Sequence, residues 1–431
     1  MLSDRGHDNL WARTAREADP FSQLASDLSA DVVIVGAGFT GLSTALHLAE
    51  RGLKPIVVEA HGIGHGGSGR NVGLVNAGMW VKPNDLIQTQ GQDWGQQLIS
   101  ALGDGPKLVF DLVERFEIAC EPERNGTLHL AVGDSGLADL RDREAQWQAL
   151  GAPVKLLDVE TATRLTGTDA FRGALHDARA GTIQPLAYAR GLARGAASAG
   201  ARIFTHSPAR NLARHGQQWQ VETPGGTIRA PWMVIATNAY TDPSQPGLLA
   251  APQQELTILP FFQFATKPLP DELAKRILPE RHGCWDTRLI MTSFRRDREN
   301  RLIFGSVGSL ESWSLAAQQS FARRSLRQLF PFLDSVEFEA RWHGQIGMNK
   351  SHLPRFHVFG EQAIGVCGFN GRGIAPGTVF GKQMAGLICG DGEMALPATL
   401  VENASFARLR TWSYRLGSCA VHLISGFGSR N

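Results

Sequence analysis

Three glycines and one acid have the types and the spacing of a dinucleotide phosphate site. A G-x-G-x-x-G turn, Gly36 to Gly41, directly follows the β-branched run 31–35. In such a turn the first glycine permits a tight bend, the second lets the backbone approach a pyrophosphate, and the third allows close helix–strand packing. Glu59 follows at the distance where an acid can accept hydrogen bonds from ribose hydroxyls. The spacing therefore predicts dinucleotide binding.

The elements that must position these residues are a strand, a helix and a second strand. The apolar runs 31–35 and 55–59 predict buried parallel strands, and the run 42–51 predicts an amphipathic helix that ends at Gly52. A helix N-terminus after the turn offers free N–H groups and a positive dipole end to phosphates. A second G-x-G-x-x-G match, 62–67, is followed by no helix-forming run, so it predicts no second dinucleotide site. With one such site, we expect the substrate, rather than a pyridine nucleotide, to supply the electrons.

Composition limits the other functions and the compartment. The 431 residues carry 43 Lys and Arg against 41 Asp and Glu, so the sequence predicts no basic surface for nucleic acid. The five cysteines form no Cys-x-x-Cys pair, which argues against a metal site and against a disulfide framework. The N-terminus lacks the pattern of a signal peptide, and no uncharged apolar stretch approaches the roughly 20 residues of a spanning helix. We expect a cytoplasmic protein without a metal or a membrane span.

The loop after Glu59 gives the sequence a specific likeness. Its Gly-, Ser-, Arg- and Asn-rich run 65–76 resembles the flavin loop of FAD-dependent amine oxidases of the D-amino-acid oxidase superfamily. Within this superfamily the sequence is similar to the branch that contains L-pipecolate oxidase and gamma-glutamylputrescine oxidase. The likeness extends from about Asp31 to about Gly390. It implies an FAD enzyme that acts on CH–NH bonds.

Three further stretches support the resemblance. The apolar run 232–241 ends in small polar residues and is similar to the family's second return to the FAD diphosphate. The runs 341–345 and 365–373 resemble the family's closing element, in which a Gly-rich turn feeds a helix, here 377–390. The N-terminus of that helix would face the flavin and stabilise negative charge on it. The paired runs within 284–305 resemble strands over the substrate side.

These stretches predict the residues that bind the cofactor. The residues expected to contact FAD are Gly36, Ala37, Gly38, Phe39, Thr40, Gly41, Glu59, Ala60, Gly67, Ser68, Gly69, Arg70, Asn71, Val72, Gly73, Leu74, Thr237, Asn238, Asn370, Gly371, Arg372, Gly373 and Ile374. The resemblance implies non-covalent FAD, because Met348 stands where sarcosine oxidase has its flavin-linked cysteine. Two lysines that the family places beside the flavin and the substrate carboxylate correspond here to Ile303 and Ala375.

The substrate side offers four candidate residues. Arg288 is the leading candidate for holding a substrate carboxylate, because its planar guanidinium matches a carboxylate, and a salt bridge to Asp286 is an equally open alternative. Arg372 is a candidate for contacting substrate or a flavin carbonyl. His343 is a candidate base or proton carrier, and Trp285 is a candidate wall of the pocket.

The predicted fold class is α/β. It consists of a discontinuous Rossmann-like FAD-binding domain and a mixed α+β substrate domain with an antiparallel sheet. By the resemblance, residues 1–82, 155–250 and 340–395 form the FAD-binding domain, residues 83–154 and 251–339 form the substrate domain, and the tail 396–431 is expected to be helical.

The resemblance predicts FAD-dependent oxidation of a small secondary amine or imino acid, with L-pipecolate as the best guess. Hydride transfer to flavin N5 would give the imine, and the electrons would pass to O₂, giving H₂O₂, or to another acceptor. A gamma-glutamylputrescine-type amine oxidase is the alternative among enzymes. A non-catalytic FAD-binding assembly or sensor protein is the alternative of another class. The expected partners are a small-molecule amine or imino acid and an electron acceptor.

Overall fold

The computed structural model describes residues 9–242, 247–333 and 335–401, together with 411, 419 and 422. The predicted C-terminal helix, 396–431, lies mostly outside these residues, and its described start contains the short strand β21 (Ala398–Thr399). In the described part of the chain, no helix combines the length and the apolar character needed to cross a membrane.

A seven-stranded sheet forms the centre of the cofactor-binding part. In spatial order its strands are β21, β19 (Arg355–Gly360), β20 (Ala363–Cys367), β13 (Trp232–Ile235), β2 (Val32–Val35), β3 (Pro55–Val58) and β9 (Arg202–Phe204). The pairs from β20 to β9 are all parallel, whereas β19 runs antiparallel to β20. Parallel strands covered on both faces are apolar throughout, which explains why the runs 31–35 and 55–59 do not alternate.

Successive residues of these strands pack against two different layers. Val32 and Ile34 join the helical side, where α2 (Phe39–Ala49), α8 (Pro185–Ser198), α12 (Ile374–Cys389) and α5 (Gly105–Arg115) lie. Val33 and Val35 face a four-stranded sheet and contribute to a separate core with Trp219. The strands of that sheet, in spatial order, are β1 (Leu28–Ser29), β12 (Gly226–Ala230), β11 (Gln218–Thr223) and β10 (Asn211–His215).

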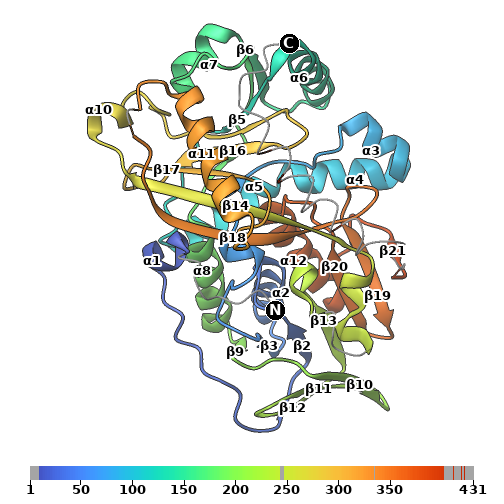
Figure 1. Ribbon diagram of the computed structural model, residues 1–431. Helices are drawn as coiled ribbons and strands as arrows, with labels where there is room; N and C mark the ends of the chain where they lie inside the picture. Colours follow the sequence, from blue (N-terminus) through green and yellow to red (C-terminus); the bar gives the residue numbers. More distant parts are fainter. Residues whose placement is uncertain are drawn as a thin grey trace.

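An eight-stranded mixed sheet forms the second part of the molecule (Figure 1). In spatial order its strands are β18 (Phe338–Met348), β14 (Thr257–Pro268), β17 (Arg301–Val307), β16 (Thr292–Arg296), β15 (Gly283–Asp286), β5 (Thr127–Leu130), β7 (Ala174–Asp177) and β6 (Val154–Leu157). Helix α11 (Leu315–Leu329) supplies Phe321 and Leu326 to the core on this sheet. The predicted α/β fold class is confirmed, and the second sheet is antiparallel except for the parallel pair of β5 with β15.

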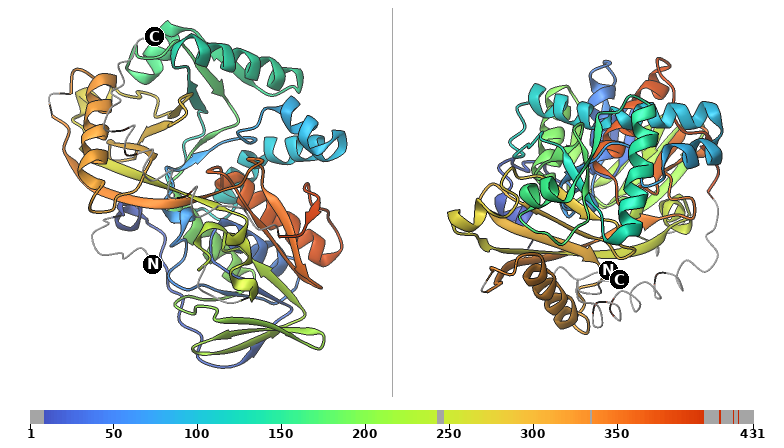
Figure 2. Two further views of the ribbon diagram at one scale, coloured as in Figure 1. Left: turned by 45° about the vertical axis from the view of Figure 1, so that its right-hand side comes forward. Right: turned by 90° about the horizontal axis from the view of Figure 1, so that it is seen from above.

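Four more helices appear at the upper and right sides of Figure 1. Helices α6 (Gly133–Ala149) and α7 (Val159–Thr166) pack on the second sheet, whereas α3 (Pro83–Gln90) and α4 (Gln92–Gly103) contact one another and the helices α5, α6 and α12. The structure differs from the predicted domain division at more than one boundary. Residues 340–348 of β18 fall in the predicted FAD-binding segment 340–395 but belong to the eight-stranded sheet, whereas α5, in the predicted substrate segment 83–154, packs against α12. Strands β6 and β7 lie almost wholly in the segment 155–250, yet they pair with the eight-stranded sheet, because β7 completes the ladder of β5. Figure 2 shows the long strands β14 (yellow) and β18 (orange) running side by side, in keeping with their antiparallel pairing.

The remaining elements are short. They are α1 (Leu10–Thr14), α9 (Ala251–Gln254), α10 (Asp271–Ala274), the 3-10 turns η1 (Gly67–Gly69), η2 (Asn238–Tyr240) and η3 (Gly247–Leu249), and the paired strands β4 (Leu74–Val75) and β8 (Gly181–Thr182). Several of them surround the cavity described next.

Candidate functional site

A cavity of about 1930 Å³ lies between the parallel sheet and the eight-stranded sheet. Gly36 and Asn238 line it from the first part, and Gln263 and Trp285 line it from the second. Small-molecule sites usually measure about 300–1,000 Å³. The cavity therefore has room for a large cofactor and a substrate together.

The predicted glycine turn opens onto this cavity. Gly36 has φ +108°, a conformation that L side chains rarely adopt, and it carries the chain from β2 toward α2. A Cβ atom at Gly41 would lie 2.0 Å from the Gly36 carbonyl oxygen. Strand and helix thus approach so closely that only glycine fits at Gly41, as the spacing predicts.

Two helices direct their N-termini at the cavity. Helix α2 begins after Gly38 and α12 begins after Gly373, and neither N-cap glycine has a side chain to accept from the first N–H groups. Both of these glycines line the cavity. Helix α12 starts at Ile374, three residues before the predicted start. Uncapped N–H groups and positive dipole ends favour an anion, so this arrangement suits the diphosphate and the flavin of FAD.

Glu59, which follows β3, contacts the backbone of the glycine turn. Its Oε2 accepts a hydrogen bond from the Ala37 N–H at 2.9 Å, and its Oε1 accepts one from the His61 N–H at 3.0 Å. Burial raises the pKa of Glu59, and the two backbone hydrogen bonds oppose this rise. Each carboxylate oxygen keeps a second lone pair, so the group can also accept from ribose hydroxyls.

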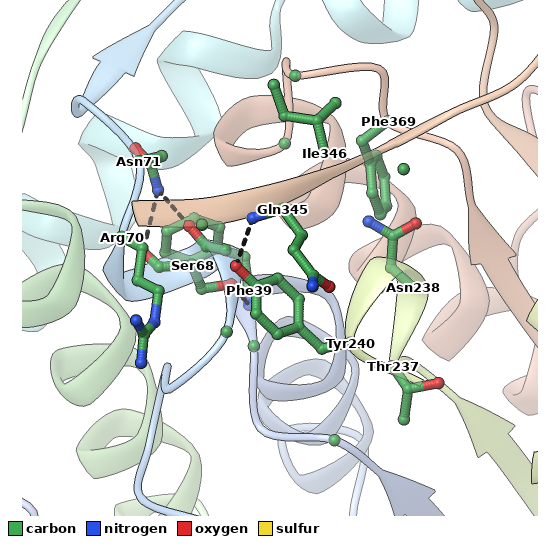
Figure 3. A pocket seen from close by; sticks show the side chains of 18 of the residues that line it. Phe39, Ser68, Arg70, Asn71, Thr237, Asn238, Tyr240, Gln345, Ile346 and Phe369 are labelled. Carbon is green, nitrogen blue, oxygen red and sulfur yellow. Dashed lines mark hydrogen bonds between the residues drawn. The ribbon is translucent and has the colours of Figure 1, made fainter. Parts of the chain in front are cut away.

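Residues 65–76, which we call the flavin loop after the resemblance, are held together by hydrogen bonds from their own side chains (Figure 3). The amide of Asn71 donates to the carbonyls of Gly67 and Ser68 at 2.9 and 3.0 Å. Arg70 donates to the His65 carbonyl at 2.7 Å and to the His343 carbonyl at 3.2 Å, which links the loop to β18. The Ser68 hydroxyl accepts from the Phe39 N–H at 3.1 Å and so joins the loop to the start of α2.

The structure brings most of the predicted residues to one cavity. Of the predicted cofactor and substrate residues, those that do not line it are Gly41, Gly69, Gly73 and Arg288. The three glycines lie behind the lining, where close backbone contacts leave no space for a side chain. His343 lines the cavity and is buried on β18. The roles of the lining residues stay predictions.

Tyr240 is a site residue that the sequence did not single out. Its hydroxyl accepts a hydrogen bond from the Gln345 N–H at 2.8 Å, and its ring lies close to Gly66 (Figure 3). Burial raises the pKa of Tyr240 to about 12. The phenol is therefore neutral at physiological pH and retains a proton to donate. The one feature of the sequence that could have indicated Tyr240 is its position after β13, two residues beyond Asn238.

Arg372 is a cation at the cavity wall, beside Trp80 and Trp285. Its Nη1 donates to the Ala77 and Met79 carbonyls at 3.1 and 3.2 Å. The guanidinium carbon lies 4.3 Å from the ring centre of Trp80 and 5.4 Å from that of Trp285. Arg372 itself lines the cavity. A planar guanidinium at a cavity wall is a suitable partner for a carboxylate.

A second arginine increases the positive charge at this wall. Arg143 of α6 donates to the Trp80 carbonyl at 3.0 Å, so both guanidinium groups bind the segment 77–80. Burial, with a smaller contribution from Arg143, lowers the pKa of Arg372 to about 9. The group remains cationic at neutral pH, and an anion at its side would relieve the cost of its burial.

Arg288 has a different environment. Its Nη1 contacts Asp286 Oδ2 at 3.0 Å, and Thr292 also donates to that buried carboxylate at 2.7 Å. The salt bridge to Asp286, which the sequence left open as the alternative to a substrate contact of Arg288, is therefore present. We therefore assign the candidate carboxylate contact to Arg372 in place of Arg288.

Comparisons with known proteins agree with this geometry. A family model described as FAD dependent oxidoreductase matches residues 31–387. Gamma-glutamylputrescine oxidoreductase of Escherichia coli (strain K12) is 30% identical over 387 residues, which cover 89% of each chain. Glycine oxidase of Geobacillus kaustophilus (strain HTA426) is 25% identical over 75% of this chain and 83% of its own.

Solved structures show the same fold. Glycine oxidase from Geobacillus kaustophilus has a TM-score of 0.69 at 20% identity, over 86% of this chain and 97% of its own. L-proline dehydrogenase from P. horikoshii has a TM-score of 0.68 at 18% identity, over 86% and 96% of the two chains.

Proposed function

The chain belongs to the family of FAD-dependent oxidoreductases, and from this premise we propose that it oxidises a small secondary amine or imino acid that carries a carboxylate. L-pipecolate is the substrate that we expect to fit. In this reaction the carbon beside nitrogen gives up a hydride and the nitrogen gives up a proton, so that the C–N bond becomes an imine. O₂, which would become H₂O₂, or another acceptor would take the two electrons. The oxidoreductase relatives favour this proposal over a non-catalytic FAD-binding role.

The residues of the glycine turn would hold the FAD diphosphate, and Glu59 would hold the ribose. Bound FAD supplies the hydride acceptor that no side chain can supply. The N-terminus of α12 would stabilise negative charge on the flavin ring, because its first N–H groups have no side-chain cap.

The observation that carries the substrate proposal is the wall formed by Arg372, Trp80 and Trp285. The guanidinium can donate to a carboxylate, while the two indole rings offer an apolar surface to a small ring or alkyl chain. An apolar surface disfavours the ammonium form of the substrate, and so does the positive charge of Arg372 and Arg143. Both effects favour the neutral amine, which is the form that can lose a hydride.

An acyclic amine of the gamma-glutamylputrescine type is the second candidate. The relative from Escherichia coli with that name supports it at 30% identity over 89% of the chain. The two candidates differ in where the carboxylate lies relative to the oxidised carbon. The turnover of the two candidate substrates can be compared with an artificial two-electron acceptor, so that the result does not depend on which acceptor is the natural one.

We expect kcat/KM for L-pipecolate to exceed that for sarcosine and for gamma-glutamylputrescine when all three are assayed with the same acceptor dye. The reason is that a cyclic imino acid would present its carboxylate to Arg372 and its ring to the two tryptophans. A higher kcat/KM for gamma-glutamylputrescine would replace the first candidate by the second. If none of the three amines turned over, both would be rejected.

FAD affinity is expected to depend on pH through Glu59. Burial raises the pKa of this carboxyl in the protein without FAD, whereas ribose hydroxyls donate more strongly to the ionised form. As pH falls through the raised pKa, FAD binding must displace a proton, so its affinity decreases. Titrating apoprotein with FAD between pH 5 and 8 should show this decrease, and Glu59→Gln should remove the pH dependence. A wild-type affinity that stayed constant over this range would contradict the assignment.

A further inference from the structure

Four successive backbone carbonyls of the flavin loop each accept a hydrogen bond from a distant side chain. Gly69 O accepts from Asn9 Nδ2 at 3.1 Å, Arg70 O from Trp342 Nε1 at 2.8 Å, Asn71 O from Trp11 Nε1 at 2.9 Å, and Val72 O from Arg295 Nη1 at 3.4 Å. We call the four donors, Asn9, Trp11, Arg295 and Trp342, the carbonyl clamp. They come from the N-terminal segment, β16 and β18.

Three of the four donors of the carbonyl clamp, Trp11, Trp342 and Arg295, form one buried group. Trp11 and Trp342 are both 0% exposed, and their rings meet edge to face at 5.6 Å. The guanidinium of Arg295, 1% exposed, lies 5.7 Å from the ring centre of Trp11. Gln184 fixes the N-terminal segment by donating to the Trp11 carbonyl at 2.8 Å. Such a buried and interlocked group can hold a loop in one position.

The flavin loop lies between the carbonyl clamp and the cavity. Arg70, Asn71 and Val72 line the cavity, whereas none of the four donors does. In a trans peptide the C=O and the N–H point in opposite directions. Because Trp11 holds the carbonyl of Asn71 on the donor side, the N–H of Val72 is directed to the other side. This N–H has no hydrogen-bond partner among the described residues.

We propose that the carbonyl clamp positions the flavin, and that Trp11 directs the N–H of Val72 toward an acceptor atom of the bound flavin ring. The N-terminal segment 9–14 is thus part of the cofactor site, although it precedes the first strand of the parallel sheet. This inference rests on FAD binding and is independent of the substrate. Trp11 is a positioning residue, because it acts through the loop.

Trp11→Phe tests the proposal, since it removes the indole N–H and keeps an aromatic ring. The dissociation constant of FAD should rise about 3- to 10-fold, which corresponds to one lost hydrogen bond. The midpoint potential of the bound flavin should become more negative and its visible absorption maximum should shift, because a donor to the flavin is displaced. The matched control is Trp219→Phe, whose buried indole donates to the Glu361 carbonyl at 3.0 Å but lies outside the cavity lining.

Asn9→Asp provides a second test at a less buried position. Its remaining oxygen can still accept from the Trp11 N–H, so the cap of α1 is kept, while the donor to Gly69 is lost. FAD should bind more weakly, and the flavin potential should shift, in both Trp11→Phe and Asn9→Asp. Neither change should occur in Trp219→Phe. Unchanged potential and FAD affinity in both variants would overturn it, as would equal changes in Trp219→Phe. If Trp11→Phe does not fold, Asn9→Asp decides alone.

Discussion

Replacing Arg372 by methionine is expected to lower kcat/KM for L-pipecolate by about 10²- to 10³-fold, the usual effect of removing one partner of a buried charge pair. The methionine fills similar space between Trp80 and Trp285 but offers no N–H group to a carboxylate. Steady-state kinetics with an acceptor dye measures the loss. FAD content should stay near that of the wild type, because the contacts proposed for the diphosphate and the ribose, the glycine turn and Glu59, do not include Arg372.

Two comparisons separate carboxylate binding from a general effect on folding. Arg372→Lys should recover part of the activity, since it keeps the charge but lacks the planar fork. L-pipecolamide, which has no carboxylate, should react slowly with the wild type and should lose little further activity in Arg372→Met. An equal loss for L-pipecolate and its amide would show that Arg372 does not contact the carboxylate.

Gly41→Ala is expected to abolish FAD retention. The added Cβ would lie 2.0 Å from the Gly36 carbonyl oxygen, so α2 must move away from the phosphate turn. Losing several backbone contacts at roughly 1 kcal/mol each should raise the FAD dissociation constant at least about 100-fold. The ratio of flavin to protein absorbance after gel filtration measures this loss directly.

Gly103→Ala is the matched control for this substitution. Gly103 is also a buried helical glycine, but an added Cβ would lie 3.4 Å from the flexible side chain of Arg179. This variant should retain FAD fully. Retention of FAD by Gly41→Ala as well would contradict the assignment of the glycine turn.

The cofactor half of the site could be predicted from the sequence because its signals are local. Gly36, Gly41 and Glu59 lie within one strand–helix–strand unit, where spacing along the chain fixes spacing in three dimensions. The same holds for the flavin loop, whose Asn71 bonds to residues only three and four positions away. The closing turn was also located, with an error of three residues at the start of α12.

The substrate half could not be predicted in the same way, because long-range contacts decide it. Asp286 and Arg288 are two residues apart, so either a salt bridge or a free guanidinium was compatible with the sequence, and the fold selects the salt bridge. Arg143 lies near Arg372 because α6 packs against the segment that contains Trp80, and no spacing of residues along the chain indicates this contact. The carbonyl clamp likewise joins residues separated by between 60 and 272 positions.

Anaerobic mixing of the FAD-loaded protein with L-pipecolate shows whether this amine reduces the flavin. The absorbance of oxidised flavin should disappear within seconds, and one equivalent of cyclic imine should form for each flavin. Dithionite, as a control, should reduce the same flavin in every sample. If dithionite reduces the flavin while neither L-pipecolate, sarcosine nor gamma-glutamylputrescine does, the protein is not an oxidoreductase of these amines.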